Sequence, residues 1–313
     1  MTRRAELPAH LYGSSFHVRD REHHRSSRSR LRAQDIQRPF VGVRSIGLEL
    51  EAVLDRCRSY EPLLRPGEAF SHTTAALLYG VPMPAGVRRA DAAPTRAPEL
   101  IEVTAAPGFT RARSAGVRGH VSAVPLPVAF HLGLPLIRPA VVWCQLATQI
   151  PITDLIAVGD AIITGSRRGV VREPALATPE ELVVAVRRWG RRRGAKALAT
   201  ALPRVRSGAE SRPESHLRLL LEDFGLPEPL PNHPTEVGGG EVLHPDLKYA
   251  HARLVLEYQG DHHRTDRRRW QADVRRRRAF ELAGWRVVEV TADDLYIDPS
   301  GLIARVRGLL AEH

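Results

Sequence analysis

Apolar residues in the C-terminal third of the chain follow two different periods. Over residues 214–226 they recur every three or four positions, which predicts an amphipathic helix ending at Gly225. Its buried stripe would consist of Leu217, Leu220, Leu221 and Phe224. Beyond this helix, apolar runs of strand length alternate with helical patterns. We predict strands within residues 243–250, 252–260 and 285–291, and helices over Trp270–Ala283 and Leu302–Leu310.

This order of helix, strand, strand, helix, strand and helix predicts an α/β fold with helices packed against a sheet. The middle of the chain, residues 46–200, mixes both periods and predicts an α+β region. A short helix over Thr73–Tyr79 would begin after Ser71, which suits the N-cap position. We further predict a strand near residues 100–103 and apolar helices over about Ala140–Gln149 and Ile152–Ile163.

Polar residues of the middle region have structural interpretations. Asp154 and Asp160 are interpreted as a helix cap and a helix-surface acid rather than metal ligands. Ser71 and His72 are adjacent and could pair as nucleophile and base, but the glycine-flanked turn that exposes a serine nucleophile is absent. We therefore expect no catalysis at this pair.

Residues 1–45 are basic and poor in apolar residues. They predict a short helix from about Val18, a turn at Ser26 and Ser27, and a basic helix near Ser29–Ile36, followed by an extended segment. That order is typical of a small winged helix-turn-helix, whose second helix lies in the major groove of DNA. The alternative is a solvated basic arm without fixed structure.

Composition adds a strong positive charge. The 313 residues carry 46 lysines and arginines against 35 acids, a formal net charge of +11, and only Lys196 and Lys248 are lysines. Such a chain attracts polyanions, most commonly nucleic acid. The alternative is a compositional bias of the genome towards arginine. DNA is therefore the expected partner, and clustering of the arginines strengthens that expectation.

The compartment follows from what the sequence lacks. No run approaches the roughly 18 apolar residues that a membrane span needs, and the first residues contain no apolar core of a signal peptide. Cys57 and Cys144 are far apart and form neither a zinc motif nor a disulfide framework. We expect a cytoplasmic protein without membrane association.

Carboxylates interrupt the predicted C-terminal strands. Asp246 follows Pro245 in the first strand, and Glu257 lies within the apolar second strand, two residues before Gln259. A buried carboxylate needs a partner or a metal ion, and residues two apart face the same side of a sheet. Hard oxygen ligands favour Mg2+, with Mn2+ as a substitute. The pattern predicts a metal site for phosphodiester hydrolysis.

The pair Pro245-Asp246, followed after ten residues by Glu257-Tyr258-Gln259, resembles the PD-(D/E)XK nuclease motif. More narrowly, residues 207–297 resemble endonuclease-like domains related to very-short-patch-repair enzymes. The positions that carry this resemblance are Asp246, Glu257, Gly260, His263, Asp273, Arg276, Gly284 and Trp285. It implies a restriction-endonuclease-like mixed sheet flanked by helices.

The resemblance also implies site residues. A glutamate of the first helix would approach the metal, and Glu214 matches it, with Glu210 as the second choice. At Gln259 the chain departs from the family, where close relatives carry Asp and the wider superfamily often Lys. Gln259 would orient the attacking water without a charge, and His263 would assist proton transfer, or else be a solvated loop residue.

Two further groups surround this motif. Asp273 and Arg276 share a helix face, either as a structural pair or as support for the site. Trp285 is expected in the core. The predicted phosphate contacts, which would position DNA without distinguishing bases, are Arg264, Arg267, Arg268, Arg269, Arg275, Arg276, Arg277 and Arg278.

The N-terminal region has a resemblance of its own. Residues 10–165, with the string GEAFSHTTAALLYGVPMP, resemble actinobacterial proteins that carry an AbiEi-type antitoxin-like region before such a C-terminal domain. We divide the chain into a winged-helix-like segment over 1–45, an antitoxin-like region over 46–200 and an endonuclease-like domain over 207–313. The N-terminal region would bind DNA or a protein partner.

The leading hypothesis is a magnesium-dependent DNA endonuclease for repair or defence, with Asp246 and Glu257 as metal ligands assisted by Glu214. The alternative is an antitoxin-like, non-catalytic DNA-binding regulator whose nuclease fold has decayed. An RNA-acting nuclease ranks lower, because stacking aromatic residues in the arrangement of common RNA-binding modules are absent.

Overall fold

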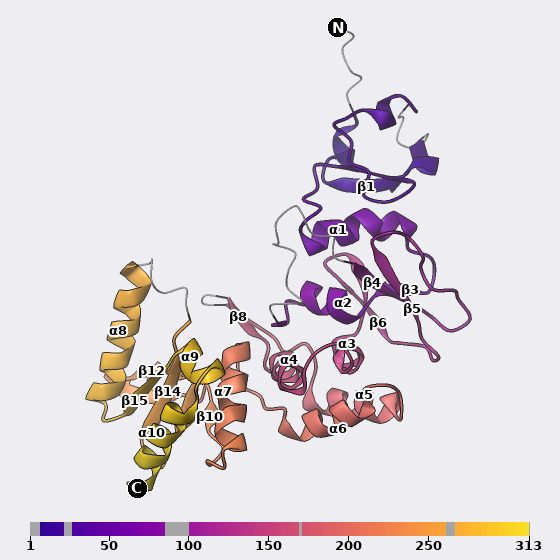
Figure 1. The fold of residues 1–313 in the computed structure, drawn as a ribbon. Helices are drawn as coiled ribbons and strands as arrows, with labels where there is room; N and C mark the ends of the chain where they lie inside the picture. The colour runs from indigo at the N-terminus through magenta and orange to yellow at the C-terminus, as the bar shows by residue number, and fades with distance from the viewer. Residues whose placement is uncertain (1–6, 22–26, 85–99, 169–170, 261–266, 313) are drawn as a thin grey trace. The chain divides into compact units, whose positions relative to one another are not determined.

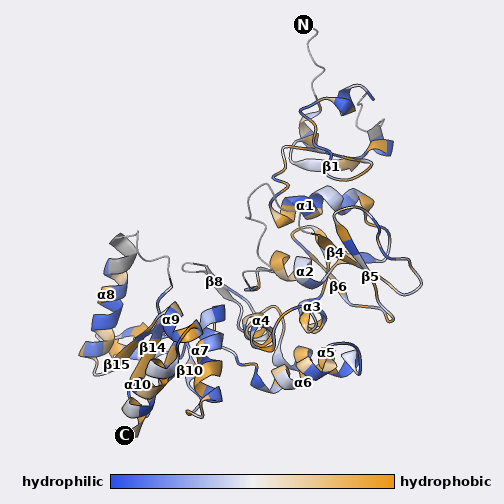
Figure 2. Cartoon of the chain, in the orientation of Figure 1, coloured by the Kyte–Doolittle hydropathy of each residue, from blue (hydrophilic) through white to orange (hydrophobic). Residues whose placement is uncertain are grey.

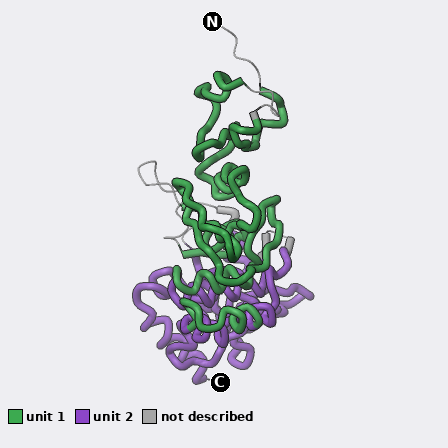
Figure 3. The backbone as a smooth tube through the Cα atoms, turned by 90° about the vertical axis from the view of Figure 1, so that its right-hand side faces the viewer, with its two compact units in different colours: residues 1–149, 184–195 green, residues 150–183, 196–313 purple. Residues whose placement is uncertain are grey.

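The computed structural model describes residues 7–21, 27–84, 100–168, 171–260 and 267–312 (Figure 1). The chain forms two compact units, one of residues 1–149 and 184–195 and the other of residues 150–183 and 196–313 (Figure 3). Both units combine helices with a mixed sheet, which confirms the predicted α/β class. Among the described residues, no helix is long and apolar enough to cross a membrane.

The first unit is built on a five-stranded mixed sheet of strand order β5-β4-β3-β7-β6. Strand β4 is parallel to β5 and antiparallel to β3, and all five of its residues are buried. Helix α2 packs against β4 and α3, and α1 also contacts α2. The strands are β3 (Glu68–Phe70), β4 (Ile101–Ala105), β5 (Val117–Val121), β6 (Val128–His131) and β7 (Leu134–Ile137), and the helices are α1 (Val53–Tyr60), α2 (His72–Leu78) and α3 (Pro139–Leu146).

The N-terminal segment differs from the winged helix-turn-helix that we expected. Strands β1 (Ser14–His17) and β2 (Val43–Ile46) form an antiparallel pair. The predicted basic helix near Ser29–Ile36 is a single 3-10 turn, Arg30–Arg32. Its apolar residues Leu31 and Ile36 join a small core with Leu7, Leu11, Phe16 and Ile46. Leu31 and Ile36 are five residues apart and so lack the three- or four-residue spacing of a helix face. The described residues 7–21 and 27–52 contain no α-helix.

The second unit begins with the apolar helix α4 (Ile152–Thr164), followed by the hairpin strands β8 (Ser166–Arg168) and β9 (Val171–Glu173). Helices α5 (Pro179–Trp189) and α6 (Ala195–Ala201) follow, and residues 184–195, which run from within α5 to the first residue of α6, are counted with the first unit. Gly190, which directly follows α5, has φ of +61°, a backbone conformation that ends a helix.

Four strands in the order β10-β13-β14-β15 form the sheet of the C-terminal part. Strands β13 and β14 are antiparallel, whereas β14 and β15 are parallel, so the sheet is mixed. A hairpin of β11 and β12 precedes β13. The elements are α7 (Arg212–Asp223), β10 (Leu230–Pro231), β11 (Thr235–Gly238), β12 (Glu241–Leu243), β13 (Leu247–Tyr249), β14 (Leu254–Tyr258), α8 (Arg267–Leu282), β15 (Arg286–Val290), α9 (Ala292–Tyr296) and α10 (Ser300–Ala311).

Helices cover both faces of this sheet, as predicted. Leu254 and Leu256 of β14 belong to a core that includes residues of α7, α9 and α10. Val255, on the other face, packs with Phe280 of α8. Helix α8 is polar over most of its length (Figure 2), so it covers the sheet with a narrow apolar contact, and Gln271, Arg275 and Arg278 are among its exposed side chains.

Three predicted side-chain environments are wrong. Phe224, expected in the buried stripe of α7, is 47% exposed because it lies at the C-cap, past the last turn that packs on the sheet. Asp160, expected on a helix surface, is fully buried and lies 2.9 Å from the guanidinium of Arg218, which is also fully buried. Asp154, expected as a helix cap, instead lies within the first turn of α4, after the N-cap residue Pro151, where it is buried and pairs with Arg212 and His216 of α7. Both aspartates thus join α4 to α7.

Candidate functional site

The carboxylates singled out in the sequence meet where β13 begins and β14 ends. Strand β13 pairs with β14 through Leu247 and Leu256, so Asp246, one residue before β13, lies beside Glu257. The Oδ2 atom of Asp246 accepts a hydrogen bond from the backbone N–H of Tyr258 at 2.7 Å. This bond fixes Asp246 against the strand that carries Glu257. The antiparallel register therefore brings the two predicted metal ligands together.

Glu257 faces helix α8. Its Oε1 lies 3.0 Å from Nη2 of Arg276 and its Oε2 lies 3.1 Å from Nε of Arg276. Burial and the neighbouring charge of Asp246 raise the pKa of Glu257 to about 7, although Arg276 opposes the shift. Burial and the charge of Glu214 likewise raise the pKa of Asp246. The acids thus form a mutually repelling group that a cation would stabilise.

Glu214 belongs to this group but also has a structural role. It is the third residue of α7, and its N–H donates to the side chain of the N-cap residue Ser211. Its Oε2 accepts from Nδ2 of Asn232 at 2.6 Å and from the N–H of Glu210 at 2.9 Å. Burial raises the pKa of Glu214. Glu214 therefore stabilises the start of α7 while its charge acts on Asp246.

A pocket opens next to Glu257 between α8 and the sheet. It is lined by Glu257, Gln259, Asp273, Arg276, Arg277, Phe280, Val287 and Glu289. Gln259 follows β14 directly, and its N–H donates to the carbonyl of Val290 at 2.8 Å. Glu257, Gln259 and Asp273 all line this pocket. The charge of Asp273 adds to those that raise the pKa of Glu257.

The predicted phosphate contacts have different environments. Arg275 and Arg278 are exposed on α8, whereas Arg277 is held by Glu281 at 2.9 Å and Glu289 at 3.1 Å. Arg276 points inward to Glu257 and donates to the carbonyl of His244, in place of the pair with Asp273 that we considered. His263 and Arg264 lie outside the described residues, and the side chains of Arg267, Arg268 and Arg269 lie outside the described part of α8.

Trp285 lies at the edge of the α8 core rather than in its centre. It packs partly buried against Val255 and Phe280. Its ring is covered by the ammonium of Lys248 at 4.9 Å and the guanidinium of Arg253 at 5.6 Å from the centroid. Both cations are thereby kept next to the sheet, where cation–π attraction stabilises them.

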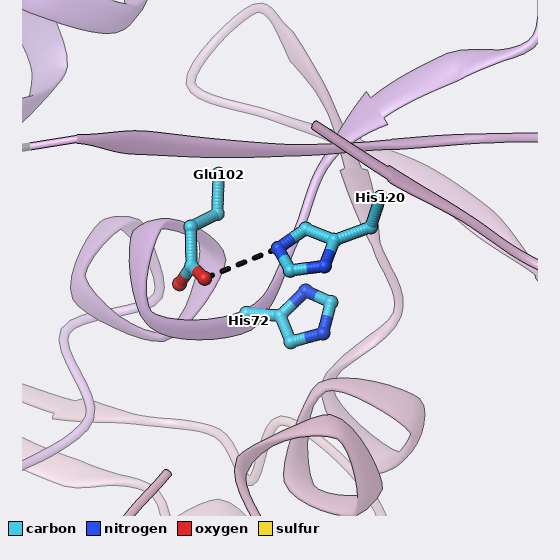
Figure 4. Close-up of side chains that lie close together, drawn as sticks. All are labelled: His72, Glu102 and His120. Carbon is cyan, nitrogen blue, oxygen red and sulfur yellow. Dashed lines mark hydrogen bonds and ion pairs between the residues drawn. The ribbon is translucent and has the colours of Figure 1, made fainter. Parts of the chain in front are cut away.

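The first unit contains a group that sequence reasoning missed. Among the described residues, His72, Glu102 and His120 are the group whose ligand atoms all lie within 4.8 Å of one another, so this group could hold a metal ion (Figure 4). The residues come from the start of α2, from β4 and from β5. The one local signal was Glu102, a carboxylate within an apolar strand, the same signal that marked Glu257.

Comparisons with known proteins give no function. No protein-family model matches the chain. Two curated relatives, the uncharacterized proteins MT2308 of Mycobacterium tuberculosis (strain CDC 1551 / Oshkosh) and Rv2248 of Mycobacterium tuberculosis (strain ATCC 25618 / H37Rv), are each 33% identical to it over 115 residues. The match covers 37% of this chain and 42% of each relative, so the chain spans less than half the length of these relatives.

Proposed function

We propose that the C-terminal part of the chain is a metal-dependent DNA endonuclease centred on Asp246 and Glu257. The observation that carries the proposal is the position of Asp246, whose Oδ2 bonds the N–H of Tyr258 and so places two carboxylates side by side. The raised pKa values of both acids support it, because perturbed acids next to a pocket such as the one that Glu257 lines are characteristic of functional sites.

The donor set fits Mg2+ or Mn2+. Asp246 and Glu257 offer carboxylate oxygens, the ligands that these hard cations prefer. The charge of Glu214 acts on Asp246, and that of Asp246 acts on Glu257, but the oxygens of the three acids do not all lie within 4.8 Å of one another, so Glu214 would assist through its charge. Asp246 and Glu257 would hold the ion. When bound, it would supply charge to the scissile phosphate and activate water.

Other residues of the chain would assist. Gln259, which lines the same pocket as Glu257, would orient the attacking water. His263, which lies outside the described residues, would assist proton transfer. The exposed arginines of α8, Arg275 and Arg278, would contact phosphates on either side of the cleaved bond. The N-terminal region would bind DNA or a partner and deliver the nuclease.

A plasmid assay tests the proposal. Supercoiled DNA is incubated with the full-length protein and Mg2+ or Mn2+, beside Asp246→Asn and Glu257→Gln, which keep shape but remove charge. Glu236→Gln, an exposed carboxylate on the β11–β12 hairpin, is the matched control. We expect nicking that needs the cation, disappears in both site variants and persists in the control. Cleavage retained in both site variants would contradict the proposal.

One observation favours the non-catalytic alternative. Arg276 already neutralises Glu257, as an internal cation would in a protein that no longer binds metal. A DNA-binding regulator would shift DNA in a gel with EDTA present and leave plasmid intact with every cation. Its Asp246→Asn variant would bind DNA as tightly as the unchanged protein. The same set of variants therefore separates the two functions.

A further inference from the structure

His72, Glu102 and His120 converge because of the sheet register and the position of α2. Strands β4 and β5 are parallel, with His120 opposite Thr104, two residues from Glu102. The side chains of Glu102 and His120 therefore lie on one face of the sheet. Helix α2 packs on β4 and begins at His72. Nε2 of His120 lies 3.2 Å from Oε1 of Glu102, and the two imidazole rings stack with centroids 3.9 Å apart (Figure 4).

Glu102 is held from two further directions. Its Oε2 accepts from the N–H of Thr73 at 3.0 Å, and its Oε1 accepts from Nε2 of Gln149 at 2.9 Å. Gln149 in turn accepts from the hydroxyl of Thr73 at 3.0 Å. The carboxylate is buried at 3% exposure, so its position is fixed before any ligand arrives. Such hydrogen bonds to a ligand carboxylate are the usual support of a metal site.

His72 is held equally firmly. Its N–H donates to Oε1 of Gln145 at 3.0 Å, and its Nδ1 lies 3.0 Å from the hydroxyl of Ser71. Its φ of +50° is in the left-handed region, which a non-glycine residue adopts at a cost that functional sites often carry. Ser71, considered above as a nucleophile, is fully buried and instead orients this imidazole.

We infer that His72, Glu102 and His120 bind a divalent transition-metal ion of the Zn2+ class. Two imidazoles and one carboxylate are the ligand set of many zinc sites, whereas Mg2+ and Ca2+ prefer oxygen ligands throughout. His120 is 27% exposed, which gives an ion access to the site.

Three ligands leave a fourth position open. Zinc sites with three protein ligands carry water or a substrate at that position, whereas structural zinc sites are closed by four. The residues at the rim of the group include the exposed Arg118, whose guanidinium lies 3.8 Å from Glu102. An anionic ligand would therefore be attracted to the open position. This site belongs to the first unit and does not depend on the nuclease proposal.

Cobalt binding tests the inference directly. The untagged full-length protein is treated with EDTA, dialysed and titrated with Co2+, whose visible absorption reports tetrahedral coordination, and then with Zn2+ in competition. His120→Ala and His72→Ala are compared with His251→Ala, an exposed histidine of the second unit. Circular dichroism checks that each variant folds. His120→Gln provides a second, milder variant.

We expect one Co2+ per chain, an absorption band that Zn2+ removes, and at least a roughly tenfold loss of affinity in His72→Ala, His120→Ala and His120→Gln. Removing a residue that only hydrogen-bonds to a metal ligand typically costs about 10- to 100-fold in affinity, so removing a ligand itself should cost at least the lower figure. His251→Ala should bind as the unchanged protein does. Equal affinity in folded His120→Gln, or no uptake of either metal, would overturn the inference and leave Glu102 and His120 as a hydrogen-bonded pair.

Discussion

The guanidinium of Arg276 spans both carboxylate oxygens of Glu257, with Nε 3.1 Å from Oε2 and Nη2 3.0 Å from Oε1. Arg276 also donates to the carbonyl of His244, so one side chain ties α8 to the end of the sheet. Its charge lies where the proposed Mg2+ ligands converge. Arg276 therefore balances Glu257 in the cation-free protein.

Removing the guanidinium of Arg276 should lower the stability of the protein. We expect Arg276→Met to lower the free energy of unfolding by about 1–3 kcal/mol at pH 8 in EDTA, because a mostly buried carboxylate loses its partner. Added Mg2+ should restore part of the loss if the ion binds at Glu257. Urea denaturation with and without Mg2+ measures both effects. Arg278→Met, an exposed neighbour on α8, should change stability by less than about 0.5 kcal/mol; an equal loss in both variants would contradict this role.

The stability of the protein should depend on the charge of Asp246. Because its pKa is raised, folded Asp246 retains a proton that the unfolded chain releases near pH 4. Burial and the charge of Glu214 raise the pKa of folded Asp246 to about 7, so stability should fall as pH rises through the window between about 4 and 7. Asp246→Asn should remove part of this fall.

The comparison is made by thermal and urea unfolding in EDTA across that pH range. Near pH 4 the variant and the unchanged protein should have similar stability. At pH 8 Asp246→Asn should be more stable by an amount of the order of 2 kcal/mol. Glu236→Gln should show no such pH-dependent difference. A variant that is less stable at pH 8 would show that the Asp246 carboxylate is stabilised, not repelled, by its surroundings.

The pairing of α4 with α7 should contribute strongly to stability. Asp160 and Arg218 are fully buried, and Asp160 also accepts from the hydroxyl of Ser215 at 2.8 Å. We expect Asp160→Asn to cost roughly 3 kcal/mol, because Arg218 would keep only Glu222 as an anionic partner, beside the carbonyl of Arg204. Chemical denaturation measures the loss.

The matched control is a surface ion pair of the same unit. Arg286 lies 2.6 Å from Glu312, whose side chain is 66% exposed. Glu312→Gln should cost less than about 1 kcal/mol, since exposed pairs gain little in water. Similar losses in the two variants would mean that the buried pair is no stronger than a surface one.

These pairs show what the sequence could and could not predict. Apolar spacing placed α3, α4, α7 and β14 within a few residues, because helix and strand periods are local. The partner of Asp160 lies 58 residues away, so no local pattern could distinguish a buried ion pair from a surface acid. The basic helix near residues 29–36 was predicted from charge, although its apolar residues lack helical spacing and instead fill a small core.

The same distinction applies to the two candidate sites. The pairing of Asp246 with Glu257 could be predicted, because each acid interrupts an apolar strand. Two strands that follow one another in the sequence and pair as antiparallel neighbours place the start of the first beside the end of the second. His72, Glu102 and His120 come from three elements, 30 and 18 residues apart, and only a parallel register together with helix packing unites them. Neither histidine lies in a spacing typical of a metal motif, so apart from the acid at Glu102 within an apolar strand, only the fold reveals the group.

If α8 faces DNA, its exposed arginines should determine the salt dependence of binding. Arg275 and Arg278 are exposed and would each release about one counterion from a contacted phosphate. Arg275→Gln and Arg278→Gln should each reduce the slope of log affinity against log salt by about 1, equally for all sequences. Fluorescence anisotropy with a short labelled duplex over a range of salt concentrations measures the slope. Arg307→Gln, an exposed arginine on α10 on the opposite face of the sheet, should leave it unchanged. An equal reduction in Arg307→Gln would mean that binding follows total charge and that α8 has no special contact with the phosphates.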